Sequence, residues 1–382
     1  MKLLRICAEG LPLFKDTMDL CFFAQQRVSE EDTDKLYNVF SNIYLNQTNA
    51  IVGINASGKT SVLKVIQLAL EILANKPINH IPSKDILGNT SEAVFNIYFY
   101  SNDEICCLRT VIGTKNEKTG ELRYYIKEET LAVKPVAGVK SKKTLTDFGN
   151  VQPVGSRSQE EAYLSDDVSF IIARNKRNHE TIDVISSLSY TNMNVLPYLE
   201  EIPAEIVSFL DPTVEKLYFS QENKKTSVHL QFKEQEEIVL SDAALLEQYL
   251  SSGTIKGIIT FSQAKRVLQD GGYLIVDEIE NHFNKEIVSA LIKFFSDSMV
   301  NTNGGCLIFS THYVELLDIY DRNDSIFLTQ NTNGIQVTNL SKILKRNDIK
   351  KSDAYQSGLI GDSTPAYDAY IQLKKSFVQA VS

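Results

Sequence analysis

Short apolar runs and one long apolar helix dominate the first third of the chain. Runs typical of strands joined by tight turns occur at residues 3–7, 19–23, 93–100, 105–112 and 121–127. Residues 62–73 instead carry apolar side chains at helical spacing, and the pattern stops before Pro77. This third of the chain therefore predicts an antiparallel β region built around one apolar helix.

Continuous apolar runs mark the strands of a second, buried sheet. They occur at residues 50–52, 273–276 and 306–309, and strands of this kind suit the centre of a sheet covered on both faces. Residues 226–232 and 237–240 also predict strands, and 242–268 predict a helix. Helical patches broken by Pro197, Pro203 and Pro212 lie between. The expected organisation is α/β, with a lobe at 1–145, a mainly helical insertion at 146–225 and a second lobe at 226–382.

Composition narrows the class of protein. Of 382 residues, 39 are Lys or Arg and 48 are Asp or Glu, so the net charge of −9 argues against coating nucleic acid through bulk charge. No stretch approaches the about 20 apolar residues that cross a membrane, and Arg5 interrupts the first apolar run. The five cysteines match no zinc pattern. We therefore expect a cytoplasmic protein without membrane partners.

Residues 53–60 carry the pattern G-x-x-x-x-G-K-[ST] between an apolar strand and the apolar helix. Glycines let the backbone approach phosphates, and successive N–H groups and the start of the helix attract anions. Lys59 would neutralise the outer phosphates and Thr60 would place a hydroxyl on Mg²⁺. The predicted ATP-binding residues are Gly53, Asn55, Ala56, Ser57, Gly58, Lys59, Thr60 and Ser61.

Two later strands end in residues suited to hydrolysis. Asp277 and Glu278 follow the run at 273–276, where Asp277 would hold Mg²⁺ through water and Glu278 would act as general base. His312 follows the run at 306–309, at the edge that faces the ligand crevice in open α/β sheets. It could hydrogen-bond the γ-phosphate or the attacking water. We therefore assign Lys59, Glu278 and His312 as candidate catalytic residues.

The order of these motifs resembles the ABC-type P-loop NTPase heads of the RecF, SMC and OLD group. The resemblance implies that the run from Leu250 to Thr254 is the ABC signature, with Ser251 and Gly253 binding the γ-phosphate held by a second subunit. It covers roughly residues 1–130 and 226–360. It implies a homodimer of heads or a higher homo-oligomer, bridged by ATP.

The acidic run from Asp277 to Asn284 is similar to the D-E-I-E-N-x-L-H-P stretch of OLD-type ATPases from bacterial phage-defence and abortive-infection operons. Three departures are visible: the usual aspartate of the ABC D-loop falls on Asn284, the H-P of the OLD pattern is Asn284-Lys285 here, and no Q-loop glutamine is assignable beyond a weak candidate in Gln152. Only 70 residues follow His312, too few for the TOPRIM nuclease domain of the OLD nucleases. The resemblance therefore implies a separately encoded effector, a nuclease or a toxin.

Other functions remain open from the residues alone. A RecF-like ATPase of DNA repair would need a continuous basic groove, and the basic candidates form three groups. A transporter nucleotide-binding subunit would need a clear Q-loop, and an ATP-binding scaffold would hardly turn over. The basic residues are Lys140, Lys142 and Lys143; Arg174, Lys176 and Arg177; and Lys345, Arg346, Lys350 and Lys351.

Overall fold

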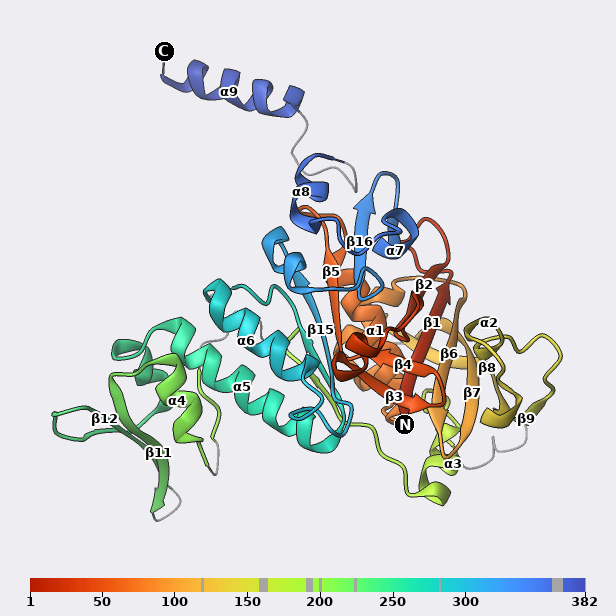
Figure 1. Cartoon of the computed structure of the whole chain (residues 1–382), viewed down its shortest axis with the longest axis horizontal. Coiled ribbons are helices and arrows are strands. Elements are labelled where there is room, and N and C mark those ends of the chain that lie inside the picture. The colour runs from red at the N-terminus through yellow and green to blue at the C-terminus, as the bar shows by residue number, and fades with distance from the viewer. Residues whose placement is uncertain are drawn as a thin grey trace.

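A sheet of six strands forms the centre of the molecule (Figure 1). The computed structural model describes residues 1–117, 120–157, 164–189, 195–198, 201–222, 225–281, 283–358 and 367–381. The strand order is β10-β14-β15-β5-β16-β17, with parallel pairing throughout except for the antiparallel edge strand β17. The strands are β5 (Thr48–Val52), β10 (Val184–Ser186), β14 (Tyr273–Val276), β15 (Cys306–Thr311), β16 (Ile326–Asn331) and β17 (Ile335–Asn339).

A second sheet of six strands is antiparallel, with the order β2-β1-β6-β7-β8-β9. It contains the apolar runs of the first third of the chain, so the predicted antiparallel region is confirmed. The strands are β1 (Lys2–Glu9), β2 (Met18–Cys21), β6 (Ala93–Ser101), β7 (Glu104–Asn116), β8 (Leu122–Pro135) and β9 (Pro153–Ser156).

Two small sheets and the helices complete the fold. Strands β3 (Leu36–Phe40) and β4 (Ile43–Asn46) pair with each other, as do β11 (Val214–Glu222), β12 (Lys225–Phe232) and β13 (Ile238–Leu240). The helices are α1 (Lys59–Leu73), α2 (Lys142–Leu145), α3 (Ile171–Asn178), α4 (Ala204–Leu210), α5 (Ser252–Asp270), α6 (Lys285–Ser296), α7 (Leu340–Ile343), α8 (Lys351–Gln356) and α9 (Tyr367–Val381).

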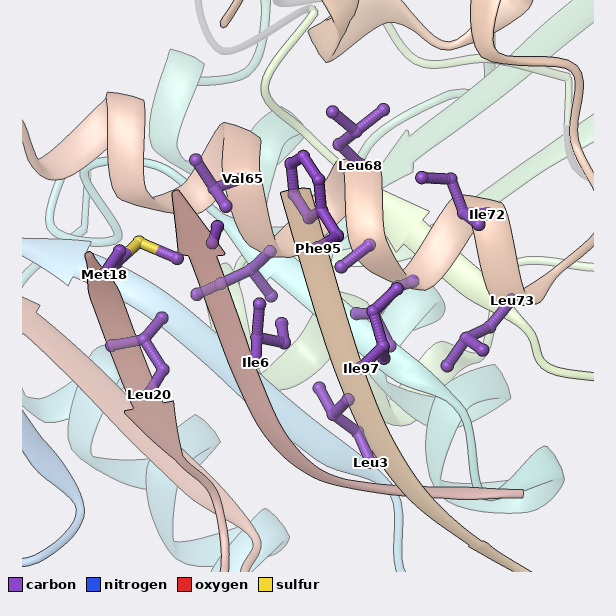
Figure 2. Packing of buried hydrophobic residues seen from close by; sticks show 14 of the residues in the cluster. Leu3, Ile6, Met18, Leu20, Val65, Leu68, Ile72, Leu73, Phe95 and Ile97 are labelled. Carbon is purple, nitrogen blue, oxygen red and sulfur yellow. The ribbon is translucent and has the colours of Figure 1, made fainter. Parts of the chain in front are cut away.

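Helix α1 is packed between the two large sheets. Figure 2 shows Val65, Leu68 and Ile72 of the helix facing Ile6 and Phe95 of the antiparallel sheet. The same cluster includes Ile51, Ile275 and Ile308 of three neighbouring strands of the parallel sheet. Because successive strand residues point to opposite faces, Leu274 and Phe309 face the other way.

The opposite face of the parallel sheet is covered by α5 and α6. Val288, Leu291 and Phe295 of α6 pack with Leu274 and Phe309, and all five are fully or almost fully buried. The prediction of central strands covered on both faces is thus confirmed, and the molecule is an α/β protein. No described helix has the length and apolar character needed to cross a bilayer.

Two stretches differ from the sequence prediction. The helix expected over 242–268 is interrupted, because Ser251 caps α5 by accepting a hydrogen bond from the Thr254 N–H at 3.0 Å. The stretch 146–225, expected to be mainly helical, contains the strands β9, β10 and β11 besides α3 and α4. Its strand β10 joins the edge of the central sheet beside β14, so tertiary pairing decides its conformation.

Candidate functional site

The loop of residues 53–58 connects the carboxyl end of β5 to the start of α1. Gly58 has a φ of 100°, and a Cβ there would lie 2.6 Å from the Ile335 side chain. A Cβ on Gly53 would lie 2.4 Å from the Thr329 hydroxyl. Both positions therefore require glycine, one for its backbone conformation and both for space.

The Lys59 side chain turns back over this loop. Its ammonium donates to the carbonyls of Gly53 at 3.0 Å and Ile54 at 3.1 Å, and lies 3.3 Å from Nδ1 of His312. Since an ammonium only donates, Nδ1 must accept, which assigns the imidazole proton to Nε2. The loop of residues 53–58, the start of α1 and the residue that follows β15 therefore meet at the Lys59 ammonium.

Burial lowers the pKa of Lys59, and three neighbouring carboxylates oppose that shift. The residue is only 6% exposed. The carboxylates belong to Asp277, Glu278 and Glu280. The charge of these three carboxylates favours the protonated form of Lys59. The three carboxylates outnumber the single ammonium, so the site carries net negative charge before any ligand binds.

Asp277 and Thr60 meet next to the lysine. The Thr60 hydroxyl donates to Oδ2 of Asp277 at 2.7 Å, and the Ser310 hydroxyl donates to its Oδ1. Ser310 also accepts the Glu278 N–H at 2.7 Å. Parallel pairing of β14 with β15 creates this arrangement, because it brings the ends of the two strands together.

Glu278 and His312 face each other across the site. The Glu278 carboxylate lies 3.6 Å from Nε2 of His312, the nitrogen that carries the proton. Glu278 has a φ of 49°, which is uncommon for a residue with a side chain. Strained backbone of this kind is concentrated at functional sites.

Glu280 contributes in a way that the sequence did not predict. Its carboxylate accepts the backbone N–H of His312 and so fixes the end of β15 to the acidic turn after β14. The residue is 8% exposed. The repeated acid in the D-E-I-E run was the available signal. Ser310, directly before Thr311 and His312, was also missed, because its role depends on strand pairing.

A cleft of about 450 Å³ opens at the carboxyl edge of the parallel sheet. Of the predicted site residues, Gly53, Ser57 and Asp277 do not line this cleft. Ser57 is buried and shares a hydrogen bond with Thr329 at 2.7 Å. The predicted residues in the wall are Asn55, Ala56, Gly58, Lys59, Thr60, Ser61, Glu278 and His312.

Ser251 and Gly253 do not line this cleft. They lie at the start of α5, where Ser251 is exposed. Asn284, which replaces the D-loop aspartate, caps α6 by accepting the Ile287 N–H at 2.9 Å. Gln152 is exposed and also lies outside the cleft wall, and His282 of the acidic run is outside the described residues.

Several basic candidates are engaged within the chain. Arg174 pairs with Glu104 at 2.9 Å, and Lys142 donates to the Gln26 carbonyl at 2.6 Å. Arg346 and Lys350 form ion pairs with Asp348 and Asp353. These four side chains therefore serve local contacts within the chain.

The Thr60 hydroxyl and the Asp277 carboxylate suit a cation that takes its remaining oxygen ligands from water or substrate. Within the described part of the chain no group of three or more His, Cys, Asp or Glu residues could hold a metal. Mg²⁺ is commonly bound by one or two protein oxygens together with substrate phosphates.

No family model matches the chain, and no curated protein matches it either.

Proposed function

We propose that this chain binds and hydrolyses ATP as an ABC-type ATPase. The observation that carries the proposal is the meeting of Lys59, Thr60, Glu278 and His312 at one cleft, on the carboxyl edge of a parallel sheet. The glycine loop leads directly into α1, whose first turn offers unpaired N–H groups to an anion. A triphosphate satisfies both the ammonium and these donors.

The residues present fit Mg²⁺ and phosphates. The Thr60 hydroxyl and the Asp277 carboxylate are already 2.7 Å apart, so they can hold one cation directly or through water. Bound Mg²⁺ supplies charge neutralisation at the phosphates. Glycine at positions 53 and 58 lets the loop backbone pack closely against Thr329 and Ile335.

Glu278 and His312 are suited to positioning a water molecule against the γ-phosphate. The water oxygen forms a bond to phosphorus while the bond to the departing ADP oxygen breaks. Glu278 takes the water proton, and the Nε2–H of His312 donates a hydrogen bond to the developing negative charge. The proposed products are ADP and inorganic phosphate.

The position of Ser251 and Gly253 outside the cleft favours a composite site. In this proposal, the signature face of a second copy completes the site, so two heads close around ATP. The proposed role is control of a separately encoded effector in bacterial antiviral defence, an association that rests on the resemblance to OLD-type ATPases. The internal pairing of Arg174 and Lys142 gives less support to a RecF-like role in DNA repair.

Glu278→Gln tests the chemical part of the proposal. We expect ATP turnover to fall by about 10²- to 10⁴-fold, because general acid–base catalysis contributes that much. ATP binding should persist, and light scattering should show an ATP-dependent dimer. Glu286→Gln, an exposed glutamate on α6, is the matched control. Equal turnover and equal oligomer size for Glu278→Gln and the parent would contradict the proposal.

Phage challenge tests the cellular part. Cells that carry the chain with its neighbouring genes should survive infection, and Lys59→Met should abolish that protection. If neither version protects the cells while added DNA stimulates hydrolysis, the repair role replaces the defence role.

A further inference from the structure

Lys256 of α5 is a half-buried residue. Its ammonium has no hydrogen bond to any described residue and is shielded from solvent. Burying an ammonium in this way is costly unless an opposite charge compensates. The charge that acts on Lys256 is the Glu278 carboxylate, which opposes the lowering of the lysine pKa by burial.

A small cavity of about 30 Å³ lies on the α5 side of the acidic strand end. Lys256 and Glu278 both line it. Among the described residues, Glu278 alone lines both this cavity and the larger cleft that contains Lys59 and His312. The Glu278 side chain therefore lies between the proposed ATP site and the shielded ammonium of Lys256.

The neighbouring acids are already held in place. Asp277 accepts hydrogen bonds from Thr60 and Ser310, and Glu280 accepts one from the His312 backbone. Among the described residues, the Glu278 carboxylate approaches Nε2 of His312 at 3.6 Å, which is longer than a hydrogen bond. It is consequently the carboxylate in this group with the freedom to change partners.

We propose that Lys256 is a positioning residue that competes with His312 for the Glu278 carboxylate and holds the proposed base idle until a second copy engages. The proposal rests on the proposed ATPase function. Helix α5 supplies the connection, because it starts at the signature and carries Lys256 in its second turn. A rise of about 1.5 Å per residue puts the lysine within about 8 Å of Ser251 along the helix axis.

In the structure the Glu278 carboxylate lies beside His312. In the proposed idle position, Glu278 instead pairs with Lys256 and lies away from the attacking water. When Ser251 engages a phosphate of the second copy, a small displacement of α5 moves Lys256 away. Glu278 then returns to His312. Helix α5 would thus connect Ser251 to Glu278 of the same chain. Each head would respond to the nucleotide bound by the other head.

Lys256→Met tests this directly, with Lys256→Arg as the conservative variant. Lys265→Met is the matched control, since Lys265 is an exposed lysine on the same helix. ATP turnover is measured at a dilute and at a high protein concentration. Lys256→Met should raise kcat at least about threefold in the dilute sample, the lower range expected for contacting residues. KM for ATP should stay within about twofold, because Lys256 lies outside the cleft.

Lys256→Arg should retain the low dilute activity of the parent, and Lys265→Met should match the parent throughout. An unchanged or lower kcat for Lys256→Met, with the parent's dependence on protein concentration, overturns the proposal.

A second readout does not require hydrolysis. Urea midpoints are compared for Lys256→Met, Glu278→Gln and the double variant. Non-additive midpoints support the contact between the two residues, whereas additive midpoints contradict it. If the parent shows no turnover, the proposed function fails on its own, and these midpoints still decide whether the lysine and the glutamate interact.

Discussion

Replacing Glu280 by alanine removes the acceptor that holds the main chain at His312. The carboxylate lies at the acidic turn after β14, and the histidine follows the end of β15. Their hydrogen bond connects two strand ends that the sheet brings side by side. Glu280 is almost fully buried, so water cannot readily replace the lost acceptor.

The size of the effect follows from the contact. A hydrogen bond to a charged group contributes about 1.5–3 kcal/mol, and an unsatisfied buried donor costs a similar amount. Since about 1.4 kcal/mol corresponds to a factor of ten, the His312 amide should exchange about ten- to a hundredfold faster. Glu280→Gln keeps an acceptor oxygen while removing the charge, so its His312 amide should exchange faster than that of the parent and more slowly than that of Glu280→Ala.

Hydrogen exchange followed by mass spectrometry measures this locally, on a peptide that covers residues 306–313. Turnover measured on the same samples should fall for Glu280→Ala, because the imidazole of His312 loses its fixed position. Glu286→Ala, at an exposed position of α6, controls for the loss of a glutamate. Exchange rates of Glu280→Ala and Glu280→Gln that both stay within about threefold of the parent would refute the reasoning.

Three further changes test other contacts. Lys59→Met should weaken ATP binding by about tenfold or more in calorimetry, because charged hydrogen bonds of about 1.5–3 kcal/mol are lost. Ser251→Asp keeps the helix cap but places a negative charge at the signature, so ATP-driven dimerisation should vanish in light scattering while thermal stability stays within about 0.5 kcal/mol. Burial raises the pKa of Glu129, so the folded protein binds that proton more tightly than the unfolded chain does. Stability should therefore fall as the pH rises above the ordinary value of 4.5, and Glu129→Gln should flatten that slope in thermal unfolding.

Much of the core was predictable because the signals are local. The buried strand β14 is a continuous run of four apolar residues, and its neighbour β15 begins with another. The glycine pattern at residues 53–60 predicted the turn between β5 and α1. The structure shows why glycine is needed there, because positions 53 and 58 leave no room for a side chain. Such features depend on a few adjacent residues, so the sequence displays them directly.

The contacts that organise the candidate site were less visible because they depend on strand pairing. Ser310 holds both Asp277 and the Glu278 N–H only because Val276 pairs with Phe309. Lys256 reaches the acidic strand end only because α5 packs against β14 and α6. The three residues of β10 are half-buried and carry no strong pattern, so only their pairing with β14 identifies them as a strand.

The balance of charge at the cleft connects these observations. Three carboxylates surround one lysine ammonium, so a bare triphosphate would meet net repulsion. Lys59 is held by the loop carbonyls as well as by these acids, and therefore stays at the cleft even without a ligand. A divalent cation at Thr60 and Asp277 would reverse the local balance and allow the phosphates to approach. In the proposed function, the same acids would make nucleotide binding dependent on Mg²⁺, and this coupling would follow from the positions of the side chains rather than from the overall charge of the chain.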